Sequence, residues 1–202
     1  MNKLGNIREP IKKNSIEKKK KIIEKGFELM CNNGYHNVNC VDIAHYAGVS
    51  TGIIYQYFKD KRDIFIAGIK MYAEKITFPM LNIMEQEEIT KDNIKTLIEI
   101  MIDKFVKTHT ISEKAHEELM AMSCIDEEIA EIFYNYEIEI TNKVSNILKE
   151  KKFRIANIEE KVHIIYGIMD NYCHEVVYHK HKTLNYDTMK EEIVKIIASI
   201  LL

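Results

Sequence analysis

A run of small polar and aromatic residues, Ser50-Thr51-Gly52 followed by Tyr55 and Gln56, carries the side chains best suited to recognition chemistry in this sequence. Hydroxyl, phenol and amide groups donate and accept hydrogen bonds. The amide of Gln56 has the geometry for a bidentate contact with adenine. A short helix that presents such a surface suits the major groove of DNA.

We predict that two short helices joined by a tight turn, within residues 39–58, position these side chains. Apolar residues recur on one face of the first helix, and Gly48 ends it because a residue without Cβ turns the chain at low cost. We expect Asn39 to cap the first helix, and Ser50 and Thr51 to cap the second by accepting hydrogen bonds from free backbone N–H groups.

The wider stretch from Gly34 to Lys61 resembles the DNA-binding domain of the tetracycline-repressor (TetR) family. The matching residues are Gly34, Ile43, Ala44, Ala47, Gly48, Val49, Ser50, Gly52, Tyr55, Tyr57, Phe58 and Lys61. Two departures stand out. Val38, Asn39 and Cys40 replace a frequent Thr-Thr-Val, and Ile54 replaces the usual Leu, which conserves volume.

The resemblance implies an all-α fold with an N-terminal three-helix helix-turn-helix DNA-binding domain and a C-terminal helical ligand-binding and dimerisation domain. We place an N-terminal arm and the DNA-binding domain in residues 1–63, with the motif at 39–58, and the second domain in residues 64–202. The expected DNA contacts are Asn39, His45, Ser50, Thr51, Gly52, Tyr55, Gln56, Tyr57 and Lys61.

These contacts divide into two kinds. Tyr57 and Lys61 are expected to hold phosphates and set the register, whereas Thr51, Gln56 and His45 can face base edges or the nearby backbone. Tyr55 is either a phosphate or groove contact or part of the packing beneath.

Composition agrees with long helices that have solvated outer faces. The 202 residues are 46% apolar and 30% charged, with only 7 Gly and 2 Pro. The net charge is +5 for residues 1–63 and −7 for residues 64–202. A basic N-terminal segment followed by an acidic C-terminal segment is typical of a phosphate-binding module attached to a domain that does not bind nucleic acid.

The sequence contains no signal peptide and no apolar run of about 18 residues, so we predict a cytoplasmic protein. Its four cysteines form no CxxC pair, which argues against structural zinc. We expect the thiols to be small core fillers in a reducing compartment. No cofactor is expected.

The spacing of apolar residues predicts helices along the rest of the chain, including residues 64–202. The chain begins with a polar, basic arm at Met1–Asn14, expected to be mobile, and a first helix at Ser15–Asn33. A helix follows the motif and should end at Phe78, before Pro79. The remaining predicted helices are Lys91–Thr108, Glu113–Met122, Glu127–Lys151, Ile158–His179 and Thr188–Leu202.

An effector pocket is expected among the helices of residues 64–202. Candidate lining residues are Met101, Phe105, Met120, Tyr136, Tyr166, Asp170 and His174. His163, Asp170 and His174 share one side of a helix, where they can line a pocket, bind a divalent metal or face solvent. His163 and Asp170 lie about 10.5 Å apart along the axis, so they cannot share one ion, and we expect no metal site.

The last two helices are expected to pair with those of a second subunit, because one short reading helix covers few base pairs and two-fold symmetry supplies a second half-site. Closure of a monomer core by these helices is the alternative.

We predict a ligand-responsive transcription regulator, by resemblance a repressor, that binds a pseudo-palindromic operator as a homodimer and is released by a small-molecule effector. A DNA-binding regulator controlled by a protein partner is the alternative. The sequence has no GxSxG, HExxH or glycine-rich phosphate cradle, which argues against an enzyme.

Overall fold

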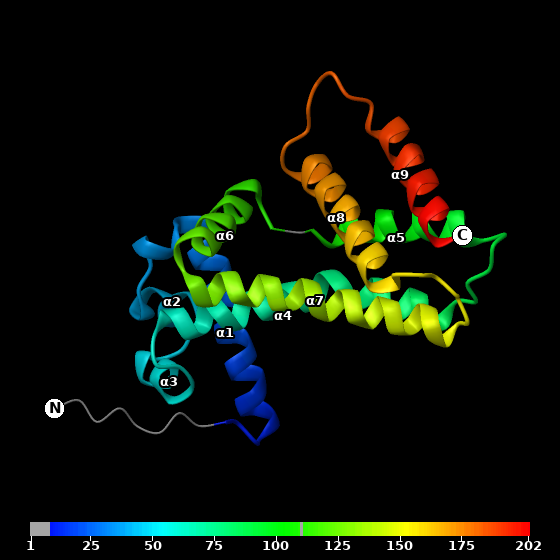
Figure 1. The fold of residues 1–202 in the computed structure, drawn as a ribbon. Helices are drawn as coiled ribbons and strands as arrows, with labels where there is room; N and C mark the ends of the chain where they lie inside the picture. The colour runs from blue at the N-terminus through cyan, green and yellow to red at the C-terminus, as the bar shows by residue number, and fades with distance from the viewer. Residues whose placement is uncertain (1–8, 110) are drawn as a thin grey trace. The chain divides into compact units, whose positions relative to one another are not determined.

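The computed structural model describes residues 9–109 and 111–202, and within them the regular structure is entirely helical (Figure 1). This confirms the predicted all-α class. The elements are α1 (Lys13–Asn33), the 3-10 helix η1 (Tyr35–Asn37), α2 (Cys40–Ala47), α3 (Thr51–Tyr57), α4 (Lys61–Gln86), α5 (Ile94–Thr108), α6 (Glu113–Ile125), α7 (Glu127–Glu150), α8 (Ile158–Val177) and α9 (Tyr186–Leu201).

None of the described helices is long and apolar enough to span a bilayer. The predicted arm at Met1–Asn14 lies partly outside the described residues, which begin at Glu9. Helix α1 begins at Lys13, two residues before the predicted start.

The chain forms two compact units. The first contains Met1–Tyr72 and Ser112–Ile129, and the second contains Ala73–Ile111 and Ala130–Leu202. Helices α4 and α7 each run from one unit into the other. These units differ from the division that we expected at residue 63, because the segment containing α6 joins the amino-terminal part of the chain.

The first unit is built around α1, which packs against α2, η1 and α6. The rings of Phe27 on α1 and Phe65 on α4 lie 5.6 Å apart and both are buried. Gly68 allows this approach, since a Cβ there would lie 2.5 Å from atoms of Phe27. One face of α1, with Ile22, Phe27 and Met30 buried, therefore forms part of the core of this unit.

Helix α4 corrects one prediction. We expected it to end at Phe78, but it continues through Pro79 to Gln86. Proline removes one backbone hydrogen bond from a helix, which the surrounding packing can outweigh. Here Met80, Leu81 and Met84, all after the proline, are buried in the second unit.

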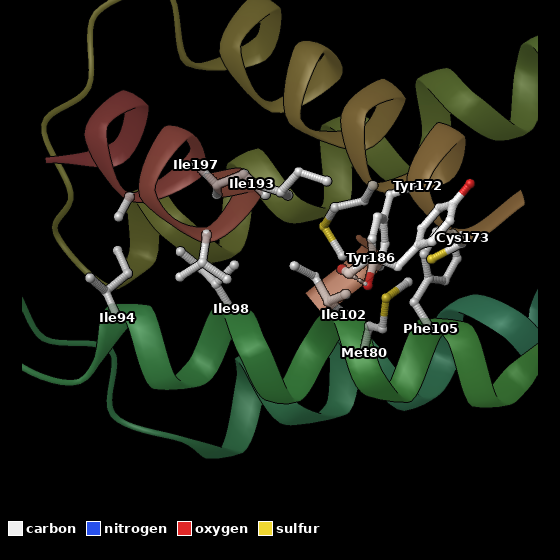
Figure 2. Close-up of a cluster of buried hydrophobic side chains, with 13 residues drawn as sticks. Met80, Ile94, Ile98, Ile102, Phe105, Tyr172, Cys173, Tyr186, Ile193 and Ile197 are labelled. Atoms are coloured by element: carbon white, nitrogen blue, oxygen red, sulfur yellow. Dashed lines mark hydrogen bonds between the residues drawn. The ribbon is translucent and has the colours of Figure 1, made fainter. Parts of the chain in front are cut away.

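The second unit has a core in which α5, α8 and α9 pack against one another. Figure 2 shows Ile98 and Ile102 of α5 pointing toward Ile193 and Ile197 of α9. The Tyr172 hydroxyl on α8 donates a hydrogen bond to the Tyr186 carbonyl over 3.2 Å. The terminal helix is thus docked within the chain by apolar burial.

Two further expectations need correction. Cys31, Cys40 and Cys173 are buried as predicted, but Cys124 is exposed on α6. Helix α6 extends to Ile125, beyond the predicted end at Met122. These differences arise because burial depends on which face of α6 meets the rest of the first unit.

Candidate functional site

Helices α2 and α3 are labelled in Figure 1, and the α2–turn–α3 segment begins with a capping box. The Asn39 side-chain oxygen accepts hydrogen bonds from the N–H groups of Val41 and Asp42, over 2.8 and 3.1 Å. The Asp42 carboxylate in turn accepts from the Asn39 N–H over 2.9 Å. The predicted cap is confirmed, and Asn39 uses its oxygen for it while its amide N–H groups remain for other contacts.

The turn itself depends on Gly48. This residue has φ +68° and ψ 40°, and its N–H bonds back to the carbonyls of Ala44 and His45. The Val49 N–H also bonds to the Ala44 carbonyl over 2.9 Å. A left-handed residue that closes a helix in this way sets the direction of the following chain, as predicted.

Ser50 stands at the N-cap of α3, but its side chain accepts no capping hydrogen bond. The expected cap by Ser50 or Thr51 is therefore wrong. The Ser50 residue is exposed, so its hydroxyl is accessible. Free backbone N–H groups at a helix start can bind a phosphate.

All nine predicted DNA-contact residues are at least partly accessible. The exposed ones are Asn39, His45, Ser50, Gly52, Tyr55 and Gln56, and the half-buried ones are Thr51, Tyr57 and Lys61. Beneath them Ile43 and Ile54 are fully buried. The segment thus separates an apolar inner face from a hydrogen-bonding outer face.

Tyr55 contacts Cys40 at the start of α2. The neighbouring Cys40 thiol, by its charge when ionised and by a hydrogen bond, raises the pKa of Tyr55. The ring is nevertheless half exposed, at 50%. Tyr55 is therefore positioned by α2 while much of its surface stays open.

Lys61 has an internal role that we did not predict. Its Nζ donates hydrogen bonds to the carbonyls of Tyr35 and Val38, over 2.6 and 2.8 Å, and lies 4.4 Å from the centre of the Tyr35 ring. Two of the three ammonium hydrogens are thus used to hold the segment before α2. The phosphate contact of Lys61 stays a prediction.

Residues of Ser112–Ile129, the second segment of the first unit, bind to residues that flank the α2–turn–α3 segment. The Glu118 Oε1 accepts from the Tyr35 N–H over 2.5 Å. Arg62 makes a bidentate pair with Asp126, over 2.7 and 2.9 Å, and contacts Glu128 over 2.5 Å. Hydrogen bonding to Arg62 lowers the pKa of Asp126. These partners lie more than 60 residues apart, so local patterns could not reveal them.

The second unit contains a cavity lined by apolar side chains from α4, α5, α7, α8 and α9. Its wall includes Leu97, Met101, Val162, Ile165, Ile197 and Leu201. Among the described residues, every side chain that lines it is apolar. The cavity therefore offers contacts to apolar groups and nothing to pair with a charge.

Of the seven predicted effector residues, only Met101 lines this cavity. Phe105 is buried in the core of α5, α8 and α9. Met120 is 46% exposed on α6, in the first unit. Tyr136 hydrogen-bonds Thr77, and burial raises its pKa to about 12. Tyr166 packs beside a neighbouring apolar cluster, where burial raises its pKa.

Asp170 and His174 meet a different partner from the one expected. His163 is exposed and its Nδ1 lies 3.1 Å from the Thr141 hydroxyl. His109, just after α5, instead joins them, and one ligand atom from each of the three residues lies within 4.8 Å of the others. Periodicity along α8 could not have located His109.

The environment of this cluster shifts all three pKa values. Burial lowers the pKa of His109, and it lowers the pKa of His174 to about 4. Burial also raises the pKa of Asp170. Each shift disfavours the charged form, as expected for titratable groups removed from water.

Comparison with known proteins locates the family of the first unit. Residues 22–67 match the family model described as bacterial regulatory proteins, tetR family. This part of the chain is therefore a TetR-family DNA-binding domain. The match runs from within α1 to the first turns of α4, so it includes the whole TetR reading segment α2–turn–α3. It is a family of regulatory proteins and not of enzymes.

The chain is also similar to the fatty acid metabolism regulator protein of Bacillus subtilis, which is 36% identical over 83 residues. The aligned part covers 41% of each chain. The match therefore concerns less than half of that relative.

Solved structures extend the likeness to the whole fold. A TetR-family transcriptional regulator from Mesorhizobium loti has a TM-score of 0.74 at 13% identity, over 94% of this chain and 98% of that one. The fatty acid degradation regulator FadR from Bacillus halodurans has a TM-score of 0.65 at 18% identity, over 90% and 94%. These TM-scores show a shared fold, with an N-terminal helix-turn-helix part and a helical C-terminal part.

Proposed function

We propose that this TetR-family chain is a transcription regulator that binds a pseudo-palindromic DNA operator as a homodimer and releases it on binding a small apolar effector. The observation that carries the proposal is the family match over residues 22–67, which falls on the segment with exposed hydrogen-bonding side chains. Repression is the sign of regulation that the family resemblance favours.

The proposed reading surface is the outer face of α3 with the start of α2. Gln56 reads a base edge, while Tyr57, Ser50 and the first N–H groups of α3 hold phosphates. Lys61 contributes chiefly through the carbonyls that it holds, so its replacement should disturb the position of α2 as well as remove a charge.

Dimerisation is proposed through α8 and α9. Ile164 on α8 and Ile196 on α9 are 55% and 45% exposed, although both helices bury another apolar face within the chain. Gly167, one turn after Ile164, leaves open space where a side chain would stand. A second copy would cover these residues and supply the second half-site that two-fold operators require.

The proposed effector is a fatty acyl compound or a similar apolar chain. The cavity has only apolar side chains in its wall, and two similar proteins are described as regulators of fatty acid metabolism and of fatty acid degradation. The effector acts by a population shift, lowering operator affinity by the ratio of its affinities for the two states.

Operator selection from random DNA with the purified protein tests the reading surface. We expect enrichment of a two-fold symmetric site with half-sites about 34–36 Å apart. Gln56→Ala should change the preferred base at one position per half-site, at a cost of roughly 1–3 kcal/mol for the original base. The matched control is Gln86→Ala at the end of α4. Selection of no sequence by the wild-type protein would contradict the proposal.

Sedimentation of Ile164→Glu and Ile196→Glu tests the dimer, with Ile100→Glu on the exposed face of α5 as control. We expect monomers from the first two variants and dimers from the control. A wild-type protein that stays monomeric while binding a symmetric operator would remove this part of the proposal. If acyl compounds bind without lowering operator affinity, control by a protein partner becomes the better account.

A further inference from the structure

His109, Asp170 and His174 bring two imidazoles and one carboxylate together in the second unit, apart from any residue of the reading surface. His109 follows α5 and the other two lie one turn apart on α8. Their potential ligand atoms lie within 4.8 Å of one another. The acidic group and the two bases are therefore close enough to share one ion after small side-chain rotations.

The distances suit a small dication. Zinc binds N and O ligands at about 2.0–2.2 Å, which places the ligand atoms of a tetrahedral site about 3.4 Å apart. His174 Nδ1 and Asp170 Oδ2 are separated by 3.4 Å. One edge of a tetrahedral site is thus already formed.

The proton on His109 is also placed correctly for metal binding. Its Nδ1 lies 2.7 Å from the Phe105 carbonyl, an acceptor, so Nδ1 carries the hydrogen in this contact. Nε2 then has the free lone pair. Metal-binding histidines usually donate their other N–H to a carbonyl or carboxylate, which fixes the tautomer and the ring direction.

Aromatic packing holds the two imidazoles. The ring centres of His109 and His174 lie 5.5 Å apart, and those of Phe105 and His109 lie 4.7 Å apart. Tyr178 packs against both histidines and is buried. This enclosure limits the rearrangement that the two imidazoles would need on binding an ion.

We propose that His109, Asp170 and His174 bind one divalent transition-metal ion of the zinc, cobalt or nickel class. Imidazole and carboxylate ligands together suit these ions better than Mg²⁺ or Ca²⁺, which prefer all-oxygen sites. Three protein ligands leave at least one coordination position for water or another small ligand. The site goes beyond the proposed regulation and does not depend on DNA binding.

Cobalt titration of the chelator-treated full chain tests this site. Bound Co²⁺ should give visible absorption that saturates at one ion per chain, and Zn²⁺ should displace it. At 100 times the dissociation constant, Zn²⁺ should raise the melting temperature by roughly 5–10 °C.

The variants His109→Gln, Asp170→Asn and His174→Gln should each weaken Co²⁺ binding by about 100-fold or more. His163→Ala, which removes the exposed histidine of the same helix, is the matched control and should bind as the wild type does.

Asp170→Asn separates a metal-binding role from a structural one. Because the asparagine amide has nearly the size and shape of the aspartate carboxyl, the variant should keep the melting temperature of the metal-free protein close to that of the wild type, while the rise with Zn²⁺ disappears. Circular dichroism then confirms that the variant is folded.

Absence of Co²⁺ absorption in the wild-type protein, or equal binding by the wild type and Asp170→Asn, would overturn the proposal. In the first case the cluster is only a hydrogen-bonded polar group, and in the second the ion binds elsewhere. Operator binding by the same preparation is measured in parallel, so failure of the metal site remains distinct from failure of the regulatory function.

Discussion

The two units of this chain are stabilised by different kinds of interaction. In the first, a helix cap, a left-handed glycine and several charged side chains fix a small surface. In the second, apolar faces of α5, α8 and α9 pack together and surround an apolar cavity. A surface that reads DNA needs fixed directions, whereas a cavity for an apolar compound needs volume and little polarity.

Charge sharpens the same contrast. The sequence divides into a basic head and an acidic body at residue 63, but the first unit includes Ser112–Ile129 with six acidic residues. That unit as a whole has 14 Lys and Arg against 13 Asp and Glu. Its attraction for DNA must therefore come from the local arrangement of donors and not from net charge.

Truncation of the apolar core should have the largest effect. Ile102 on α5 is fully buried, so Ile102→Ala should lower the free energy of unfolding by about 2–5 kcal/mol. Urea unfolding measures this change. Ile100→Ala, the same substitution at a 47% exposed position of α5, should stay within about 0.5 kcal/mol. Equal effects would mean that α5 is not packed as described.

The turn of the first unit should be sensitive to backbone strain. Gly48→Val places a branched residue at φ +68° and should cost about 2 kcal/mol, with loss of operator binding. Gly52→Ala is the control for stability, because its Cβ would meet nothing nearer than 4.0 Å and alanine favours a helix. A Gly48→Val protein with unchanged thermal unfolding would show that the turn adopts another conformation.

Filling the cavity should separate effector binding from DNA binding. Ile165→Phe adds volume to the cavity wall and should weaken binding of an acyl compound by about tenfold, or 1.4 kcal/mol, with operator affinity unchanged. Calorimetry with a fatty acyl ligand and a mobility-shift assay measure the two quantities. Ile138→Phe, at an exposed position of α7, should change neither.

The smallest effect is expected from the charge pair of the first unit. Arg62→Ala should cost at most about 1 kcal/mol at pH 7, because the Arg62 and Asp126 side chains remain 34% and 20% exposed. The folded pKa of Asp126 lies below its unfolded value of about 3.9. The contribution is therefore present above pH 4 and is lost as the pH falls through the folded pKa.

Urea unfolding at pH 7 and pH 3 should show the difference between the wild type and Arg62→Ala shrinking at the lower pH. Lys143→Ala on α7 removes a more exposed pair with Glu139 and is the matched control. A difference that persists at pH 3 would assign the effect of Arg62 to packing rather than to charge.

The sequence predicted the reading segment closely because its determinants are local. The cap by Asn39 and the left-handed Gly48 act within one or two turns of chain, and both are found. The Ser50 cap failed, and Pro79 did not end its helix. Helix α4 continues through Pro79 because burial of the residues after the proline outweighs the preference of proline to end a helix.

The effector pocket stays a prediction, and of its seven expected residues only Met101 lines the apolar cavity. Leu97, Val162 and Ile165 lie on apolar helix faces, yet the pattern of such a face is the same whether it meets a core or a cavity. The predicted lining of the effector pocket therefore included polar residues such as Tyr166 and Asp170. The nearness of His109 to Asp170 depends on two helices more than 50 residues apart.

The sequence by itself determined the helical class, the resemblance to the TetR family and the segment with accessible hydrogen-bonding side chains, because helix periodicity, caps and turns are encoded by neighbouring residues. Only the tertiary structure decided that Glu118 and Arg62 anchor the reading surface, that an apolar cavity lies among five helices, and that His109 joins Asp170 and His174. Each of these three features depends on packing between segments that are far apart in the sequence. Such packing is decided by the volumes and burial of all the side chains in a unit together.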